Sequence, residues 1–261
     1  MSSDKQVESR LRLTSPTIYE IISTEGQEEL SRPFSSLGWS GLVAGLCISF
    51  CLLAEGYLRL HLPEGQNNFL IENIGYTFGF IIVITARLQL FTENTITVIL
   101  PLLERKIMKN FIRTAKLWAV VFASNLCGTL LVAVLIAFAG FATADQLAVF
   151  IEISEHAVIG DPMDIFIRGI PAGFIIATLV WMMPSAKGME IFVIFLMTYL
   201  IAIGDFTHVV AGSCEAFLLA LTHHASWGDA ITYIGMAGLG NIIGGSALFS
   251  VLAYAQVKDE M

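Results

Sequence analysis

Six long apolar segments constrain the fold of this chain more than any other feature. They cover residues 37–58, 69–103, 112–141, 165–184, 189–221 and 230–255. A helix of about 20 apolar residues crosses the hydrocarbon core of a bilayer, where every backbone polar group must find its partner inside the protein. Only 14% of the 261 residues are charged, whereas a soluble domain has about 25%. The sequence therefore predicts an all-α membrane protein with six transmembrane helices in a lipid bilayer.

The polar segments complete the predicted organisation of the chain. In the N-terminal segment, residues 1–36, we expect Ser15 to cap a short amphipathic helix with Pro16 in its first turn. Residues 37–256 then form the six-span domain, and residues 257–261 form a short tail.

Basic and acidic residues are divided between two of the loops. The loop after the second span is basic, with Arg105, Lys106, Lys109, Arg113 and Lys116. The loop after the third span is acidic, with Asp145, Glu152, Glu155, Asp161 and Asp164. Because basic loops stay in the cytoplasm, we expect a multi-pass protein of the inner (plasma) membrane with both termini cytoplasmic.

Charge and cysteine content exclude several classes of function. The net charge of −8 argues against a nucleic-acid partner, which would require basic patches. The four cysteines lie in apolar segments without CxxC spacing, as small residues that pack between helices do. We therefore expect no metal, no cofactor and no enzymatic activity.

The two halves of the chain share three motifs in the same order. The first span has Gly41 and Gly45 where the fourth has Gly169 and Gly173. Phe-Thr pairs follow in the second and fifth spans, at 91–92 and 206–207. Asparagines follow in the third and sixth, Asn125 and Asn241, 34 and 35 residues after the phenylalanines. Because three is odd, a duplicated three-span unit must enter the membrane from opposite sides. The sequence predicts an inverted 3+3 repeat.

The second and fifth spans are too long for single helices. They have 35 and 33 residues, which would extend about 50 Å as helices, against a hydrocarbon core of about 30 Å. Each carries a polar stretch near its middle, LQLFTENTIT at 89–98 and AIGDFTHVVAGS at 202–213. We expect both spans to break at the midplane, where unpaired backbone groups must line a pathway inside the protein. The alternative is a long, tilted helix with a chance polar cluster.

Ionisable residues at membrane depth are candidates for function. His208 is the only one of five histidines inside a span, and its structural alternative is a hydrogen bond between helices. Arg87 and Asp205 lie near the two breaks, where they could pair with each other or contact substrate. Glu93 aligns with His208 when the Phe-Thr pairs are superimposed, and Glu215 is expected at a solvated position.

The motifs SPTIYEI, LFT, FTH and GNIIGG, in this order, resemble the formate/nitrite transporter family from Ser15 to the end of the sixth span. The resemblance implies an aquaporin-like protomer, a homopentamer and one channel for small monovalent anions in each protomer. It assigns the central histidine to His208, the threonine of the second span to Thr92 and the asparagine of the sixth to Asn241. Constriction positions and their neighbours fall at Tyr76, Phe80, Leu90, Phe91, Ile176, Ile201, Phe206 and Thr207.

Several family features differ in this sequence. Thr207 replaces a glutamate before the histidine, Gly173 replaces an asparagine in the fourth span, and Ala157 lies where the family has a lysine outside the pore. Arg87 is not part of the family pattern. It could attract the anion electrostatically, as the missing lysine does in the family. These differences indicate a divergent branch of the family.

A bare anion is costly to move through apolar constrictions, whereas the neutral acid is not. We therefore expect His208 to donate a proton to the anion, with Thr92 and Asn241 orienting the two partners. A channel for water or small neutral solutes would have the same architecture, but the paired NPA motifs of such channels are missing. A membrane redox enzyme would need a haem or metal site that the residues do not provide.

Overall fold

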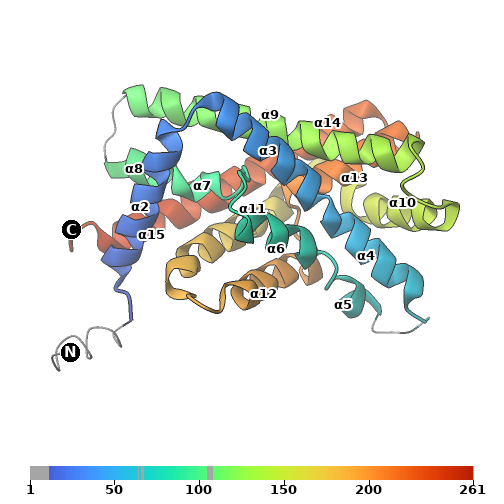
Figure 1. Ribbon diagram of the computed structural model, residues 1–261, viewed down its shortest axis with the longest axis horizontal. Coiled ribbons are helices and arrows are strands. Elements are labelled where there is room, and N and C mark those ends of the chain that lie inside the picture. The colour runs from blue at the N-terminus through green and yellow to red at the C-terminus, as the bar shows by residue number, and fades with distance from the viewer. Residues whose placement is uncertain (1–11, 64, 66–67, 105–107, 261) are drawn as a thin grey trace.

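The computed structural model describes residues 12–260, except 64, 66–67 and 105–107, and the described chain is helical (Figure 1). The N-terminal helix α2, Ser15–Ser31, begins one residue earlier than expected. Thr14 is its N-cap, and the Thr14 hydroxyl accepts a hydrogen bond from the Thr17 backbone N–H. Ser15 is the first helical residue. The buried Tyr19 side chain of α2 donates a hydrogen bond to the Leu100 carbonyl at 3.0 Å, so α2 packs on the helical domain.

Five helical segments are long and apolar enough to cross a membrane, at Phe34–His61, Asn68–Thr85, Asn110–Phe138, Pro162–Ser185 and Trp227–Val257. The first comprises α3, Phe34–Ile48, and α4, Phe50–His61. The second comprises α5, Asn68–Glu72, and α6, Thr77–Thr85. The others are α9, Met108–Phe138; α11, Pro162–Met182, with the 3-10 turn η1, Met183–Ser185; and α14, Trp227–Ile242, with the π-helix η2, Ile243–Ser250, and α15, Val251–Val257.

Two of the predicted spans are not continuous helices. After α6 the chain leaves the helical path and resumes as α7, Asn94–Thr97, and α8, Ile99–Glu104. The predicted span 189–221 consists of α12, Glu190–Ile203, and α13, Val209–Leu221. Each of these pieces is shorter than a membrane span.

Close helix contacts bring the asparagine-bearing helices against their partners. A Cβ atom added at Gly45 of α3 would meet the Asn125 carbonyl of α9, and one added at Gly173 of α11 would meet the Asn241 carbonyl of α14. Small residues permit this approach in membrane helices. As a result, both asparagines lie at the level of the two interruptions.

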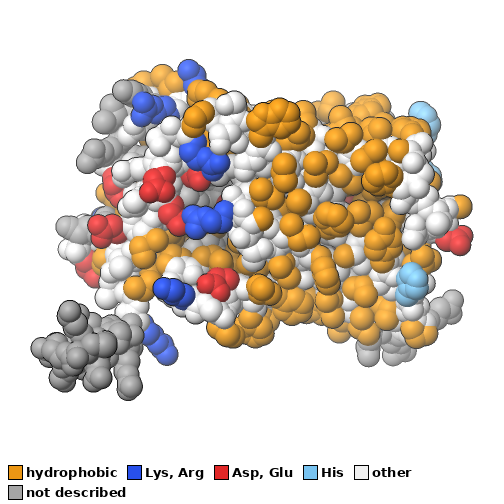
Figure 2. All heavy atoms as spheres, viewed as in Figure 1, with side chains coloured by type: hydrophobic (Ala, Val, Ile, Leu, Met, Phe, Trp, Pro, Cys, Tyr) orange, Lys and Arg blue, Asp and Glu red, His pale blue; other side chains and the backbone are white. Residues whose placement is uncertain are grey.

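The acidic loop predicted after the third span contains a further helix, α10, Ala144–Val158. Thr143 and Gln146 form a capping box at its start. Helix α10 packs against α4 and α13 at the end of the molecule opposite α2 (Figure 1). Figure 2 shows a broad apolar face between these ends, with charged side chains gathered at the α2 end.

Candidate functional site

The two helix interruptions have the same backbone structure. At the end of α6, Arg87 adopts φ 53°, and at the end of α12, Asp205 adopts φ 54°. The residues that follow close the turn: the Leu88 N–H donates to the Val83 carbonyl, and the Phe206 N–H donates to the Ile201 carbonyl, both at 3.0 Å. This is the Schellman motif, formed here by two residues other than glycine.

Two asparagines hold the chain immediately after these turns. The Asn125 amide donates to the Gln89 and Gly41 carbonyls at 2.9 and 2.8 Å, and its oxygen accepts from the Phe91 N–H at 2.9 Å.

Asn241 makes the corresponding bonds in the second interruption. It donates to the Thr207 and Gly169 carbonyls and accepts from the Val209 N–H, each at 2.9 Å. The asparagines therefore satisfy backbone groups that the interrupted helices leave unpaired.

The asparagine hydrogen bonds align the two halves of the chain differently from the Phe-Thr pairs of the sequence. His208 lies between the two backbone groups bound by Asn241, and Leu90 lies between the two bound by Asn125. The structural counterpart of His208 is therefore Leu90, and the alignment of Glu93 with His208 is wrong by three residues.

His208 is almost completely buried, with 1% of its surface exposed. Its Nδ1 accepts the Ala211 backbone N–H at 3.2 Å, which makes His208 the N-cap of α13. Because Nδ1 is an acceptor, the neutral ring carries its proton on Nε2, which lies 2.7 Å from the Thr92 hydroxyl oxygen. The Phe80 ring packs edge-on against the imidazole, with 4.9 Å between ring centroids.

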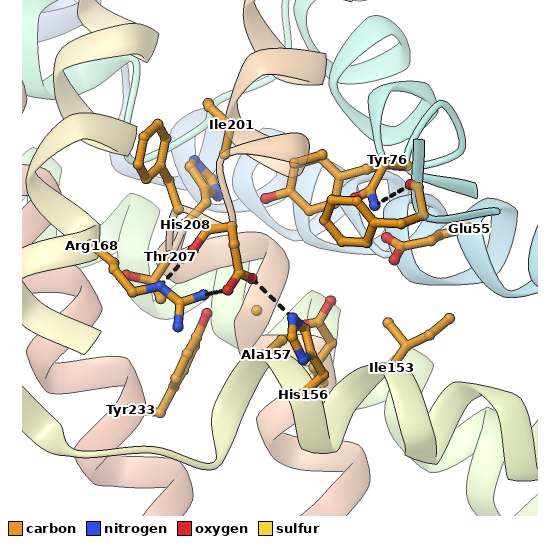
Figure 3. A pocket seen from close by; sticks show the side chains of 17 residues that line it. Glu55, Tyr76, Ile153, His156, Ala157, Arg168, Ile201, Thr207, His208 and Tyr233 are labelled. Carbon is orange, nitrogen blue, oxygen red and sulfur yellow. Dashed lines mark hydrogen bonds and ion pairs between the residues drawn. The ribbon is translucent and has the colours of Figure 1, made fainter. Parts of the chain in front are cut away.

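A cavity of about 60 Å³ borders His208 on the side of α10; we call it the His208 cavity (Figure 3). At its mouth, Asp205 forms ion pairs with Arg168 and, at 3.3 Å, with His156. Arg168 also donates from Nε to the Asp205 carbonyl at 2.6 Å, which supports the left-handed turn. The other lining residues include Glu55, Tyr76, Ile201, Phe206, Thr207, Glu215 and Tyr233.

A second cavity, of about 330 Å³, lies at the α2 end of the molecule; we call it the Arg87 cavity. Arg87 forms an exposed ion pair with Glu25 of α2, with 3.2 Å between nitrogen and oxygen. The other lining residues include Leu90, Glu93 and Glu190. Arg87 and Asp205 thus have separate partners in separate cavities. Ala157, at the site of the missing lysine, lines the His208 cavity together with Arg168.

The candidate residues that line neither cavity include Thr92, Asn241, Phe91 and Ile176. Thr92 is fully buried and contacts the imidazole, whereas all hydrogen-bonding groups of the Asn241 amide are bound to backbone. The Phe91 ring packs on Phe122, with centroids 4.6 Å apart, and Ile176 lies in the hydrophobic core. Thr207, which lines the His208 cavity, donates its hydroxyl to the Ile165 carbonyl at 2.7 Å.

Sequence reasoning missed most of the charged residues of the His208 cavity. Arg168 and Glu55 lie within predicted spans, and their charge at membrane depth was the available signal. Glu215, expected in solvent, is only 4% exposed. Within the described part of the chain, no group of three or more His, Cys, Asp or Glu residues could hold a metal ion.

Comparisons with known proteins agree with this arrangement. The family model described as formate/nitrite transporter matches residues 16–255. The chain is 40% identical to the inner membrane protein YfdC of Escherichia coli K12, over 97% of this chain and 82% of that protein. It is 25% identical to the formate channel FocA of Haemophilus influenzae, over 96% and 97% of the two chains.

Solved structures share the fold. A structure described as an FNT family ion channel superimposes with a TM-score of 0.80 at 15% identity, covering 92% of this chain and 98% of that one. A pentameric formate channel with formate bound gives 0.71 at 19% identity, covering 86% and 97%. The matched motifs and the family model lead to one conclusion: this chain belongs to the formate/nitrite transporter family.

Proposed function

We propose that this protein conducts small monovalent anions of weak acids, such as formate or nitrite, across the inner membrane. The single observation that carries the proposal is the buried His208–Thr92 pair, which adjoins a cavity at one end of the molecule while Leu90 adjoins the cavity at the other. The names of two relatives, an inner membrane protein and a formate channel, support the location and the substrate class. The pentameric formate channel of similar fold supports a homopentamer with one path in each protomer.

The proposed membrane arrangement is an inverted 3+3 repeat with six crossings. In this arrangement α12 and α13 together make the fifth crossing, and both interruptions lie at the midplane. The identical Schellman turns and asparagine bonds of the two interruptions support a twofold relation between the halves. The basic loop after the second crossing supports a cytoplasmic position for the Arg87 cavity and both termini.

The centre of the path is suited to a neutral acid. Phe80 and Leu90 are both fully buried and present only carbon to a passing molecule. Transfer of a bare anion into such a constriction has an idealised cost of order 20 kcal/mol, and several kcal/mol after relaxation. The anion therefore takes a proton at His208 and crosses the constriction uncharged.

The hydrogen bonds of His208 define how the imidazole can donate. A protonated ring carries hydrogens on both nitrogens, so Nδ1 must first release the Ala211 N–H. Donation of the proton to the anion lets Nδ1 accept this N–H again and restores the cap of α13. Recapping thus favours the transfer of the proton from the imidazolium to the anion.

Uptake of formate into proteoliposomes tests the proposal. Uptake by the wild-type protein should accelerate as external pH falls, because more of the carrier and more of the acid are protonated. His208→Phe should reduce uptake to the level of protein-free vesicles, whereas His61→Phe, at an exposed position, should not change it. Undiminished uptake by His208→Phe would contradict the role of His208 as proton donor.

A second candidate function is a channel for water or small neutral solutes. Carboxyl groups outnumber cationic groups in both cavities, which disfavours bare anions and is compatible with neutral solutes. Stopped-flow light scattering of vesicles in water, formamide and formate gradients separates the two functions. Rapid swelling with formamide and none with formate would favour the neutral-solute channel.

A further inference from the structure

Two buried carboxyl groups face the His208 cavity without a partner. Glu55 of α4 and Glu215 of α13 are 8% and 4% exposed, and both line the cavity. Within the described residues, neither side chain makes a hydrogen bond or an ion pair. Arg59, one turn after Glu55, is instead paired with Glu152 at 2.7 Å and with Glu72 at 3.9 Å.

Two tyrosines border the same space. Tyr76 and Tyr233 are 9% and 2% exposed, and both line the cavity (Figure 3). The Tyr233 hydroxyl lies directly over Gly212, where an added Cβ atom would collide with it. The cavity lining therefore includes two carboxyl groups and two tyrosine hydroxyls that form no hydrogen bond with another side chain or backbone group among the described residues.

The two basic side chains of the cavity lining, Arg168 and His156, contact another carboxylate. Arg168 and His156 both bind Asp205 at the mouth, so neither neutralises Glu55 or Glu215. Two ionised carboxylates would repel an approaching anion in this partly dehydrated space. A protonated carboxyl, in contrast, donates an O–H hydrogen bond to the anion. The cavity thus accepts an anion when these two groups carry protons.

We propose that Glu55 and Glu215 form a proton relay that supplies the acid crossing at His208. This inference rests on the proposed function, since it specifies where the transferred proton comes from. The O–H bond of one carboxyl breaks, and its proton passes through solvent in the cavity to His208 and then to the anion. The electron pair stays on the carboxylate, which takes a new proton from hydronium at the cavity mouth.

The surroundings of the pair define which other groups respond to pH. The titratable and charged groups that line the cavity with the pair, or interact electrostatically with it, are Cys51, Arg59, Glu72, Tyr76, His156, Arg168, Asp205, His208, Cys214 and Tyr233. Of these, Arg59, Glu72, Arg168, Asp205 and His156 already have ionic partners. Glu55 and Glu215 are the two carboxyls of the described cavity lining that remain available for proton exchange.

The test uses Glu55→Gln, Glu215→Gln and the double variant of the full-length protein in proteoliposomes. Formate uptake and acidification of the vesicle interior are measured between pH 5 and pH 8, which are chosen assay limits. We expect each variant to lose at least about tenfold in uptake at the acidic limit, as general acid groups commonly contribute 10² or more. The double variant should also lose the part of the pH dependence that comes from the protein, and keep the part that comes from protonation of the acid itself.

Controls separate this inference from its alternatives. Asp145→Asn, at an exposed carboxyl of α10, should behave as wild type. Glu215→Asp, which keeps the carboxyl, should retain the pH dependence even where Glu215→Gln does not assemble. Faster uptake by the glutamine variants at neutral pH would show that the carboxylates only repel the anion, and it would overturn the relay.

The outcome also distinguishes the relay from the proposed function. If wild-type protein takes up no weak-acid anion at any pH, the proposed function fails and the relay fails with it. If wild type and His208→Phe behave as proposed but the glutamine variants keep the normal pH dependence, only the relay is wrong.

Discussion

The two helix interruptions share a backbone structure and differ in their side chains. Both turn through a left-handed residue, and both are held by an asparagine from a neighbouring helix. At equivalent central positions, however, one presents Leu90 and the other presents His208. The same turn and the same asparagine bonds can therefore hold either a leucine or a histidine at the central position.

The difference extends to the cavities. The left-handed residue beside Leu90 is Arg87, which is exposed and pairs with the N-terminal helix. The one beside His208 is Asp205, which is held by Arg168 and His156. In the proposed path, one interruption would provide an apolar barrier, and the other would provide a polar group at the end of a carboxyl-lined cavity. This asymmetry predicts that proton exchange occurs from one side of the barrier.

The largest effect on formate uptake should follow from placing the same residue at the central position of both interruptions. His208→Leu gives both interruptions a leucine, and we expect formate uptake to fall by at least about 100-fold, the low end of general acid contributions. The reciprocal double variant, Leu90→His with His208→Leu, should not restore uptake, because the Thr92 hydroxyl contacts the ring only at position 208. Initial uptake rates in proteoliposomes measure both. Recovery in the double variant would show that the two centres are interchangeable.

The asparagines test the shared scaffold. Asn125→Leu and Asn241→Leu each remove three hydrogen bonds to buried backbone groups. At about 1–3 kcal/mol for each unsatisfied group, we expect a loss of several kcal/mol of stability in both variants. Thermal unfolding in detergent should therefore shift by a similar amount in the two. A large shift in only one variant would contradict the equivalence of the interruptions.

A smaller effect is expected from loss of the hydrogen bond between Thr92 and His208, which joins the two interruptions. Thr92→Val removes the hydroxyl that lies 2.7 Å from His208 Nε2 and preserves the shape of the side chain. We expect about a tenfold loss of uptake, equivalent to a hydrogen bond of about 1.4 kcal/mol, and retention of uptake in Thr92→Ser. Equal rates for the valine and serine variants would show that the hydroxyl does not position the imidazole.

The helical pattern of this chain could be predicted from sequence because apolar length and polar interruptions are local signals. The stretch 202–213 contains the interruption between α12 and α13, and the stretch 89–98 overlaps the one before α7. The family follows from motifs whose order is also visible in the sequence, and the family model confirms it.

The register and the cavities could not be predicted in this way. The Phe-Thr pairs look equivalent in the sequence, but they are not at equivalent positions in the structure. The true alignment is set by the backbone groups that the asparagines bind, and backbone groups are the same for every residue type. The His208 cavity brings together Glu55, Arg168 and Glu215 from three separate helices. Their convergence depends on packing between distant segments, so each residue looked like an isolated charge in its own span.

The smallest effect should appear at the two left-handed residues, where glycine would remove the steric cost of a side chain. Arg87→Gly should stabilise the protein by about 1 kcal/mol, because the left-handed conformation costs a non-glycine residue roughly that much and the exposed Glu25 pair contributes little.

Asp205→Gly gains the same relief but removes the partner of Arg168 and His156, so we expect no gain or a net loss of stability. Thermal unfolding of the two variants side by side measures the difference. Equal stabilisation of both would mean that the ion pairs of Asp205 contribute nothing to the turn. The asymmetry between the interruptions would then lie only in Leu90 and His208.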